Sequence, residues 1–493
     1  MILNYEEFKD KVNACWIGKN IGGTMGTPYE GRREMQDISG FVTKPGEVLP
    51  NDDLDLQLVW LLAMEQIGPK AISAATLGEY WVSFITPHWN EYGIGKCNLK
   101  RGLQAPLAGD YLNHWKNSNG AWIRTEIWAS VAPGMPAAAA RYAIEDAKVD
   151  HGAGEGTYAA AFVAAMQSAA FIISDIRKCI EIGLAAIPES SRMAKSIKFL
   201  FECYEKGMDY REARNAVQQL NADIGDGWFE APSNVSYAVI GLLWGEGDFK
   251  KTMIYAINCG DDTDCTGATV GATMGIMNGM AGIPEDWMSY LGDEIITISI
   301  ARGNNARRLP ATCTALTERV VKLAPSVLFA NRYLGEVEIS EAKATAIPDN
   351  AEEILFNGAK RANQEFSRLQ PYMTHFDSVL FNVDVILPNG PDIEPNGTVP
   401  VSINIYNNYY PETHENAPYN LTLRWLTPEG ITVTGGKRAV YLDEASPHDH
   451  APCAKLNVTV NAGESVEAVN RIVLEIVAEG RPTATYVPVV LLG

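Results

Sequence analysis

The sequence predicts two folded parts, an all-helical domain over residues 1–340 and an all-β antiparallel sandwich over residues 371–493, joined by a connecting helical segment over residues 341–370. Alanine-rich runs of helical length, separated by Gly and Pro loops, fill the first part, and the alternation typical of strands is scarce there. After Pro371 the chain changes to short β-branched runs bounded by Gly, Pro, Asn or Asp. A chain of 493 residues is long enough for two or three domains.

Three alanine-rich runs in the first part predict its central helices. These runs cover residues 136–147, 156–174 and 266–280. Small side chains along a helix let neighbouring helices approach closely. We therefore expect a compact multi-helix bundle whose central helices are buried.

Seven short runs in the last part predict strands. They cover residues 378–387, 399–406, 420–426, 431–433, 455–460, 471–477 and 484–492. Roughly seven strands in such a short stretch are typical of an antiparallel β-sandwich. Its role stays open between carbohydrate binding and packing against the helical domain or a second subunit. The sequence is also compatible with a homo-oligomer.

The composition argues against several classes of protein. A net charge of −20 disfavours a nucleic-acid-binding surface, because such surfaces need clustered Lys and Arg. The eight Cys include no CxxC pair, which disfavours a structural zinc site and a disulfide framework, so reduced thiols are expected. The seven His are dispersed except for His448-Asp449-His450, for which we expect a solvated loop.

The sequence predicts neither a membrane helix nor a secretory signal. No run reaches the roughly 18 to 20 uninterrupted apolar residues that a membrane helix needs. Residues 1–13 carry Glu6, Glu7 and Asp10 where a signal peptide would be basic and then apolar. A cytoplasmic protein is therefore expected, although a processed secreted or periplasmic form would have the same sequence.

Two clusters of carboxylates carry the chemistry of this sequence. One lies at residues 51–55 and the other at residues 261–264, about 200 residues later. Adjacent carboxylates repel one another when they are desolvated, so a buried turn tolerates them mainly when a cation compensates. Each cluster stands at the predicted start of a helix. We therefore expect the two clusters to build one shared divalent metal site.

Helix capping is the simpler explanation for the first cluster. Asn51 or Asp52 suits the N-cap of the apolar helix that follows, and carboxylates near a helix N-terminus stabilise it by about 0.3 to 1 kcal/mol each. An amide oxygen and two carboxylates in a row exceed what a cap requires. In the second cluster, Asp262 and Asp264 are alternate residues that can converge on one cation. Ligation by oxygen favours Mg²⁺, with Mn²⁺ or Ca²⁺ as alternatives, over zinc.

Both clusters match motifs of a known family. Asn51-Asp52-Asp53-Leu54 stands where this family has T-D-D-T. Gly260-Asp261-Asp262-Thr263-Asp264-Cys265 stands where it has G-G-D-x-D-T/S before a Gly/Ala helix. With these motifs the chain resembles the ADP-ribosylglycohydrolase family, which includes the dinitrogenase-reductase-activating glycohydrolases. The resemblance implies an all-α ADP-ribosylglycohydrolase-like domain that binds one or two divalent ions.

Further segments support the resemblance in the same order along the chain. Residues 22–30 resemble the family's G-D-x-x-G-x-x-x-E, residues 119–124 its N-G-A-x-M-R, and residues 150–152 its T-H-x. Residues 235–238 and 282–287 resemble its S-V-x-x-A and I-P-x-x-W elements. The match extends over about residues 10 to 310.

The resemblance implies roles for individual residues. The implied metal ligands come from both clusters and comprise Asn51, Asp52, Asp53, Asp262, Asp264 and Cys265. The predicted catalytic residues are Glu30, Asp53 and Asp262, and Glu30 is either a ligand or the carboxylate that orients or deprotonates water. Substrate binding is expected at Asn119, Gly120, Trp122 and His151. Helix capping stays an alternative for His151, and for Arg124 a structural ion pair is favoured.

Four positions depart from the family motifs. Asn51 and Leu54 replace threonines, Asp261 replaces a glycine, and Cys265 replaces a Thr or Ser ligand. A thiol is a poor partner for Mg²⁺, so these changes indicate that one metal position is weakened or lost. They also leave room for a substrate other than an ADP-ribosylated protein.

The predicted activity is that of a hydrolase, a glycosidase in enzyme class EC 3.2. Cleavage of a ribosyl bond passes through an oxocarbenium-like transition state and needs an activated water, leaving-group assistance and charge stabilisation. We expect a metal-dependent glycohydrolase that cleaves an N- or O-ribosyl bond in a ribosyl or ADP-ribosyl small molecule or in a modified protein. Hydrolysis of another nucleoside or small sugar conjugate, and non-catalytic binding of ADP-ribose or a sugar, stay as alternatives.

Overall fold

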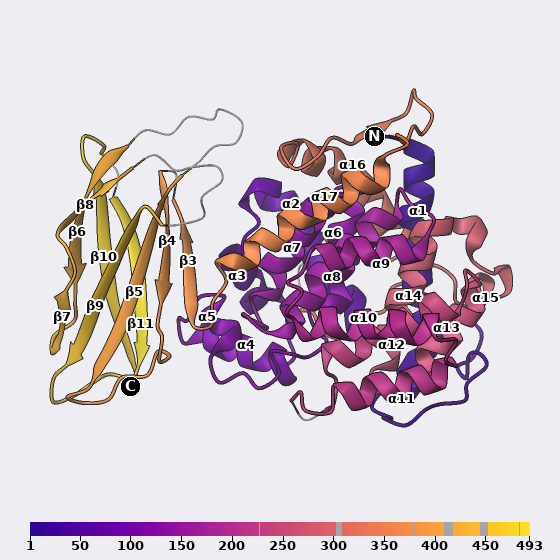
Figure 1. Cartoon of the computed structure of the whole chain (residues 1–493), viewed down its shortest axis with the longest axis horizontal. Helices are drawn as coiled ribbons and strands as arrows, with labels where there is room; N and C mark the ends of the chain where they lie inside the picture. The colour runs from indigo at the N-terminus through magenta and orange to yellow at the C-terminus, as the bar shows by residue number, and fades with distance from the viewer. Residues whose placement is uncertain (226, 302–307, 379, 409–417, 444–451, 483) are drawn as a thin grey trace. The chain divides into compact units, whose positions relative to one another are not determined.

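The structure is a computed structural model in which two compact units are distinguished (Figure 1). The helical unit comprises Met1–Gly93 and His114–Phe366, and the sheet unit comprises Ile94–Asn113 and Ser367–Gly493. The described residues are 1–225, 227–301, 308–378, 380–408, 418–443, 452–482 and 484–493. The cluster His448-Asp449-His450 lies outside them. The domain boundaries near residues 340 and 370 stay a prediction.

Helices make up most of the helical unit. They are α1 (Tyr5–Gly26), α2 (Asp52–Ile67), α3 (Ala74–Phe84), α6 (Glu126–Val131), α7 (Pro136–Ala147), α8 (Glu155–Ala170), α9 (Ile176–Ala185), α10 (Arg192–Glu205), α11 (Tyr210–Leu220), α12 (Ala231–Trp244), α13 (Phe249–Asn258), α14 (Thr263–Asn278), α15 (Glu285–Leu291), α16 (Cys313–Ala330) and α17 (Ala351–Asn363). Helix α4 (Asn90–Lys100) begins in this unit and continues into the sheet unit, which also holds α5 (Leu107–Asp110). The predicted helical domain is confirmed, and the three alanine-rich runs correspond to α7, α8 and α14.

Two very short strands also belong to the helical unit. β1 (Ile2–Asn4) and β2 (Glu338–Ser340) pair in parallel. The sequence did not predict them, because three residues are too few to show the alternation that identifies a strand.

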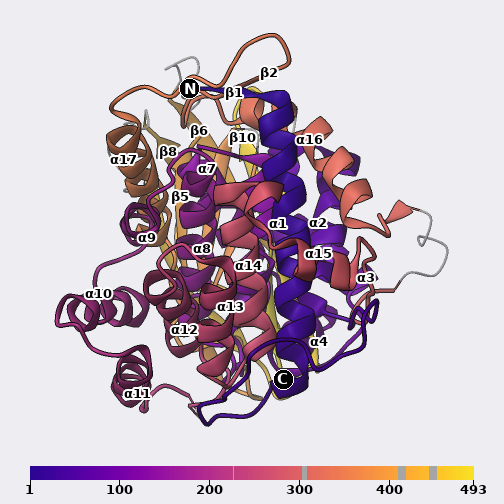
Figure 2. The same ribbon diagram turned by 90° about the vertical axis from the view of Figure 1, so that its right-hand side faces the viewer.

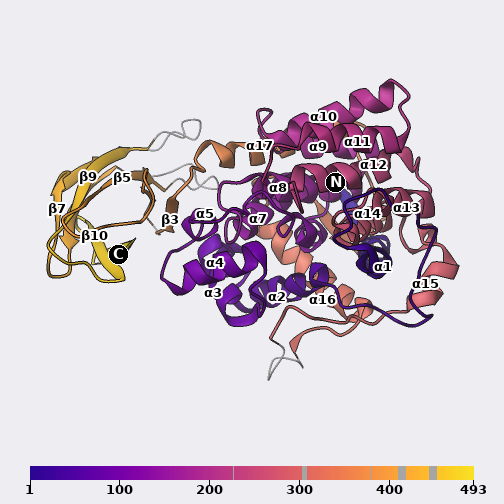
Figure 3. The ribbon, with the colours of Figure 1, turned by 90° about the horizontal axis from the view of Figure 1, so that it is seen from below.

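Helices α1 and α14 pack backbone against backbone. They lie side by side in two perpendicular views (Figures 2 and 3). A Cβ atom added to Gly22 would lie 2.0 Å from the carbonyl oxygen of Gly267, and one added to Gly18 would lie 2.2 Å from that of Gly271. Only glycine permits so close an approach. This seam fixes the first turn of α14, with its carboxylates, against the end of α1.

The sheet unit contains two antiparallel sheets (Figure 1). Its strands are β3 (Met373–Asp377), β4 (Phe381–Ile386), β5 (Thr398–Asn407), β6 (Tyr419–Leu426), β7 (Ile431–Gly435), β8 (Ala439–Leu442), β9 (Ala454–Ala462), β10 (Val469–Ala478) and β11 (Ala484–Leu492). One sheet has the strand order β11-β10-β6-β8 and the other β3-β4-β5-β9-β7. Alternate apolar side chains of both sheets share one hydrophobic core, so the predicted β-sandwich is confirmed.

Every predicted strand overlaps an observed one, and the sequence missed β3 and β8. β3 contains His375 and ends on Asp377, and β8 is only four residues long, so neither shows a clear β-branched alternation. Among the described residues, no helix has the length and apolar character that a bilayer crossing requires.

Candidate metal centre

The first acidic cluster forms the N-terminal turn of α2. Asn51 is the N-cap, and its side-chain oxygen accepts a hydrogen bond from the backbone N–H of Asp53 at 2.8 Å. Asp52 and Asp53 follow in the first turn, and the Tyr92 hydroxyl donates to Asp52 Oδ2 at 3.1 Å. Asp55 has a different role, because its Oδ2 accepts the backbone N–H of Ser299 at 2.5 Å and so anchors that loop.

The second acidic cluster forms the N-terminal turn of α14. Asp262 is the N-cap residue, and its Oδ2 accepts a hydrogen bond from Asn119 Nδ2 at 2.6 Å. The backbone N–H of Asp262 donates to Asn234 Oδ1 at 3.2 Å. The Oδ1 atoms of Asp262 and Asp264 are buried and accept no hydrogen bond from the described residues. Buried carboxylate oxygens without a donor are expected where a cation binds.

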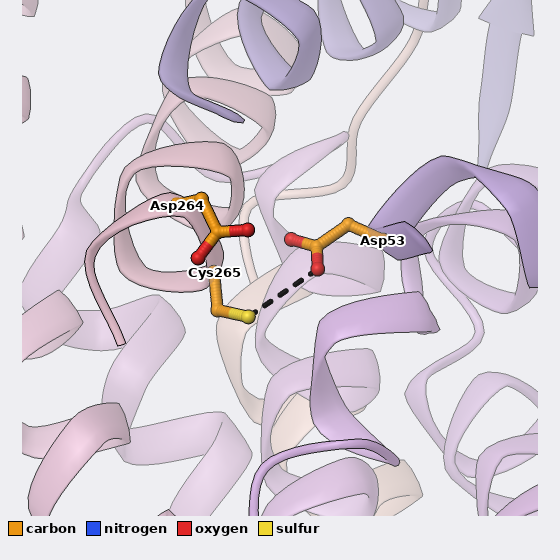
Figure 4. Close-up of side chains that lie close together, drawn as sticks. All are labelled: Asp53, Asp264 and Cys265. Carbon is orange, nitrogen blue, oxygen red and sulfur yellow. Dashed lines mark hydrogen bonds between the residues drawn. The ribbon is translucent and has the colours of Figure 1, made fainter. Parts of the chain in front are cut away.

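The structure brings the two clusters together with Glu30. One ligand atom from each of Glu30, Asp262 and Asp264 lies within 4.8 Å of the others. Asp53, Asp264 and Cys265 form a second group by the same criterion, so Asp264 belongs to both. In Figure 4, Asp53 on α2 points toward Asp264 and Cys265 on α14, and Cys265 Sγ donates to Asp53 Oδ1 at 3.3 Å.

Burial and the crowding of like charges raise the pKa values of these carboxyl groups. The pKa of Glu30 rises to about 8, chiefly because of the charge of Asp264, with burial and Asp52 adding to the effect. Burial and the charge of Asp264 raise the pKa of Asp52 to about 7. Burial, followed by the charge of Asp264, also raises the pKa of Asp262. A bound divalent cation would stabilise the ionised forms that this crowding disfavours.

The loop after residue 118 supports the carboxylates. Asn119 bonds Asp262 through its amide nitrogen, and its oxygen accepts from Trp122 Nε1 at 2.9 Å. Trp122 is fully buried and opens the 3-10 turn Trp122–Arg124. A Cβ at Gly120 would lie 2.2 Å from Glu91 Oε1 and 2.7 Å from Tyr92 Cε1, so any larger residue would have to displace these side chains. The loop therefore fixes the orientation of Asp262, and a direct contact of Asn119, Gly120 or Trp122 with substrate stays a prediction.

His151 belongs to a buried polar network. Its Nδ1 lies 2.8 Å from Asp150 Oδ1, and its Nε2 lies 3.4 Å from Ser118 Oγ. Arg124, which is fully buried, pairs with Asp150 at 2.8 Å and with Asp146 at 2.9 Å. Although burial disfavours its charge, Arg124 and His151 keep the pKa of Asp150 below its usual value. Arg124 thus has the structural ion pairs that the sequence favoured, and substrate contact by His151 stays a prediction.

Sequence reasoning did not assign a role to Lys19 or to Asn234. Lys19 is fully buried on α1 beside Asp53 and Glu126. Burial alone would lower its pKa, but Glu126 and Asp53 hold that pKa above its usual value. A lysine among the small and apolar residues 14–26 was the signal that could have identified it. Asn234 gave no such signal, because its contacts depend on the tertiary fold.

Comparison with known proteins identifies the family. A sequence model described as ADP-ribosylglycohydrolase matches residues 4–322, more than half of the chain. The chain belongs to the ADP-ribosylglycohydrolase family. The matched segment contains Glu30 and both acidic clusters, so the candidate metal centre lies within the part that defines an ADP-ribosylglycohydrolase.

Solved structures are similar to parts of this ADP-ribosylglycohydrolase-family chain. One described as "ADP-ribosylglycohydrolase-related protein complex" has 20% identity and a TM-score of 0.38, over 65% of this chain and 98% of that chain. A FixG-related protein from Vibrio parahaemolyticus has 10% identity and a TM-score of 0.17, over 23% and 97% of the two chains. The GAE domain of GGA2p from Saccharomyces cerevisiae has 10% identity and a TM-score of 0.16, over 24% and 96%. No curated protein sequence matches.

The donor set fits the divalent metal on which ADP-ribosylglycohydrolases generally depend. Glu30, Asp262 and Asp264 offer only carboxylate oxygens, which are the donors that Mg²⁺ and Mn²⁺ prefer. Cys265 does not fit this preference, because it offers a thiol that hydrogen-bonds Asp53. The oxygen of Asn51 is engaged at the helix N-cap, where it accepts the N–H of Asp53.

Proposed function

We propose that the chain is a divalent-metal-dependent glycohydrolase that cleaves an N- or O-ribosyl bond of an ADP-ribosyl conjugate. The observation that carries this proposal is the convergence of Glu30, Asp262 and Asp264, with buried Oδ1 atoms on both aspartates that lack a hydrogen-bond donor among the described residues. A site built from carboxylate oxygens, two of them from the N-terminal turn of α14, suits a hard cation and a sugar with vicinal hydroxyls. Mg²⁺ is the proposed ion, with Mn²⁺ as its closest substitute.

Different residues of the site would have different roles in such a reaction. A bound divalent ion supplies charge stabilisation and lowers the pKa of water. Asp262, held by Asn119, keeps a fixed orientation toward the reacting sugar. Glu30 has an exposed side chain and a pKa raised to about 8, so near neutral pH it is poised to exchange a proton with water. We assign to Glu30 the role of orienting or deprotonating the attacking water. Asp53 forms the side of the cluster that lies across from Asp264 and Cys265.

The test is release of ADP-ribose from a panel of N- and O-linked ADP-ribosyl conjugates, and release of ribose from nucleosides and small ribosides. We expect turnover that requires added Mg²⁺ or Mn²⁺ and stops with a chelator. Asp262→Ala should abolish that turnover while circular dichroism shows an unchanged helix content, because the side chain faces the cluster. Metal-dependent turnover restricted to nucleosides would reassign the substrate class. Binding of ADP-ribose in calorimetry without turnover of any conjugate would reassign the chain as a binding protein.

A further inference from the structure

Lys19 places a fixed positive charge beside one side of the acidic cluster. Its side chain extends from α1 and is fully buried. The ammonium nitrogen Nζ donates to the carbonyl oxygen of Ile123 at 2.8 Å and lies 3.1 Å from Glu126 Oε2 and 3.6 Å from Asp53 Oδ2. A buried ammonium is tolerated only with such partners, so Lys19, Glu126 and Asp53 form one electrostatic unit.

Both oxygens of Asp53 already face groups of the protein. Oδ2 lies 3.6 Å from the Lys19 ammonium, an ion pair in which no described residue donates a hydrogen bond to it, and Oδ1 accepts the S–H of Cys265 at 3.3 Å (Figure 4). The thiol is a weak donor and a soft ligand, which suits this hydrogen bond better than coordination of a hard cation. The negative charge of Asp53 is therefore compensated by Lys19 of the same chain.

The Glu30 side of the cluster is compensated less, because the Lys19 charge acts on Asp264 without forming an ion pair with it. Among the described residues, no Lys, Arg or His forms an ion pair with Glu30, Asp262 or Asp264. Asp262 Oδ1 and Asp264 Oδ1 are buried and accept no hydrogen bond within that same part of the chain. This side offers three carboxylates to a cation, whereas the other side offers the shared Asp264, a thiol and Asp53, which is paired with Lys19.

We propose that Lys19 serves as a built-in cation for the Asp53–Cys265 side, so that the chain binds a single divalent ion, held by Glu30, Asp262 and Asp264. The inference rests on the proposed metal-dependent function and specifies the number and place of its ions. A second divalent ion at Asp53 would meet repulsion from the ammonium and would compete with the hydrogen bond from Cys265. The Asp264 carboxylate belongs to both groups. It would then bind the single ion, and no second ion would bind between it and the Asp53–Cys265 side.

Ion counting tests this proposal on the full-length protein. After removal of divalent ions, titration with Mn²⁺ alone, followed by calorimetry and by electron paramagnetic resonance, should give one ion per chain with a mononuclear spectrum. Two ions per chain with a spin-coupled spectrum would overturn the inference and leave the proposed function intact, because ions at about 3.5 to 4 Å in two-metal sites interact. Zero ions would overturn the metal dependence itself.

A matched pair of variants locates the ion. Asp262→Asn and Asp53→Asn make the same change of carboxylate to amide at two buried positions. We expect Asp262→Asn to lose the Mn²⁺ and Asp53→Asn to retain it with an affinity within about tenfold of wild type, a factor that corresponds to 1.4 kcal/mol. Loss of the ion in Asp53→Asn together with its retention in Asp262→Asn would overturn the proposal.

Replacement of the lysine completes the test. Lys19→Met removes the ammonium, so a second Mn²⁺ should bind at Asp53 and the spectrum should become spin-coupled. Lys11→Met is the control, because Lys11 lies on the same helix and donates to the Phe171 carbonyl at 2.9 Å. A folded Lys19→Met protein that still binds one ion would overturn the proposal. If Lys19→Met does not fold, the Asp53 and Asp262 pair decides.

Discussion

Asp261 combines an unfavourable backbone conformation with favourable side-chain contacts. Its φ is +66°, in the left-handed region that favours glycine, which is the residue found in the family motif. Its carboxylate accepts hydrogen bonds from Asn234 Nδ2 at 2.9 Å and from the backbone N–H of Phe229 at 3.2 Å. The Asp261 carboxylate therefore holds the loop before α12 next to Asp262. Because its oxygens accept these hydrogen bonds, Asp261 is not a candidate metal ligand.

Two substitutions at Asp261 separate these effects. Asp261→Gly and Asp261→Ala both remove the carboxylate, and leaving its buried donors unpaired should lower the free energy of unfolding by about 1 to 3 kcal/mol. The alanine variant should lose about 1 kcal/mol more, because its Cβ disfavours a positive φ. Thermal unfolding of the three proteins measures both differences. Equal melting temperatures for the two variants would contradict the strain argument.

The individual carboxylates could be predicted from the sequence because runs of acidic residues are local patterns. Asp262 and Asp264 stand two residues apart, and Asn51 precedes α2 as an N-cap should. The partners that orient these residues could not be predicted, because they are brought together only by the fold. Lys19 meets Asp53 across two helices, and Asn119 reaches Asp262 from a distant loop.

At the scale of elements, the α1–α14 seam determines whether the metal centre forms. Gly26 of α1 lies against the backbone of Thr263, since a Cβ there would be 2.2 Å from the Thr263 carbonyl oxygen. Any side chain along the seam would push the first turn of α14 away from α1. The small residues of 266–280 predicted close packing, although the sequence did not identify α1 as the partner helix.

Gly22→Ala tests the seam. In an open helix, this change would stabilise by about 1 kcal/mol through helix propensity. Here the new Cβ would meet the Gly267 carbonyl oxygen at 2.0 Å, so we expect a net loss of about 1 to 3 kcal/mol in the free energy of unfolding. Gly358→Ala is the matched control, because Gly358 lies inside helix α17 and its added Cβ would come no closer than 3.6 Å to a neighbour, Pro136. Denaturant unfolding in which both variants behave alike would contradict the packing argument.

In the sheet unit, a histidine between two carboxylates joins strands β3 and β4. His375 Nδ1 lies 2.6 Å from Asp384 Oδ1, and its Nε2 lies 3.1 Å from Asp377 Oδ1. Burial disfavours the cation, but hydrogen bonds to both carboxylates outweigh burial and raise the pKa of His375 to about 10. The sequence could not predict the contact between His375 and Asp384, because the residues of β3 lack the pattern that identifies a strand.

The raised pKa of His375 predicts a pH dependence. Because the folded state binds the proton more tightly than the unfolded chain, the stabilisation is fully present below about pH 6.5 and is lost as pH rises through about 10. His375→Gln should be less stable than wild type at pH 6, and the difference should shrink toward pH 10. Urea unfolding at several pH values, followed by circular dichroism, measures this difference. A difference that does not change with pH would show that His375 is neutral.

At the scale of the whole chain, the sheet unit is not continuous in sequence. It includes Ile94–Asn113, a segment that interrupts the sequence of the helical unit. Leu103, Leu107 and Tyr111 of this segment are buried in the hydrophobic core that the two sheets share. The Tyr111 hydroxyl also donates to Asp392 within the same unit. Sequence patterns located the main helical and strand regions but could not show this exchange, because a helical segment carries no local sign of packing on a sheet.

Removal of residues 367–493 should therefore damage the part that remains. The truncated chain would expose Leu103, Leu107 and Tyr111, and burial of each such side chain contributes about 1.5 to 3 kcal/mol. We expect the truncated protein to aggregate during size-exclusion chromatography, and the same truncation with Leu103→Gln, Leu107→Gln and Tyr111→Gln to recover soluble protein. A truncated chain that stays monomeric without these changes would show that the segment does not depend on the sheets. The sandwich would then be free for another role, such as the carbohydrate binding that stays open for it, and binding of polysaccharide by the full chain but not by the truncated chain would establish that role.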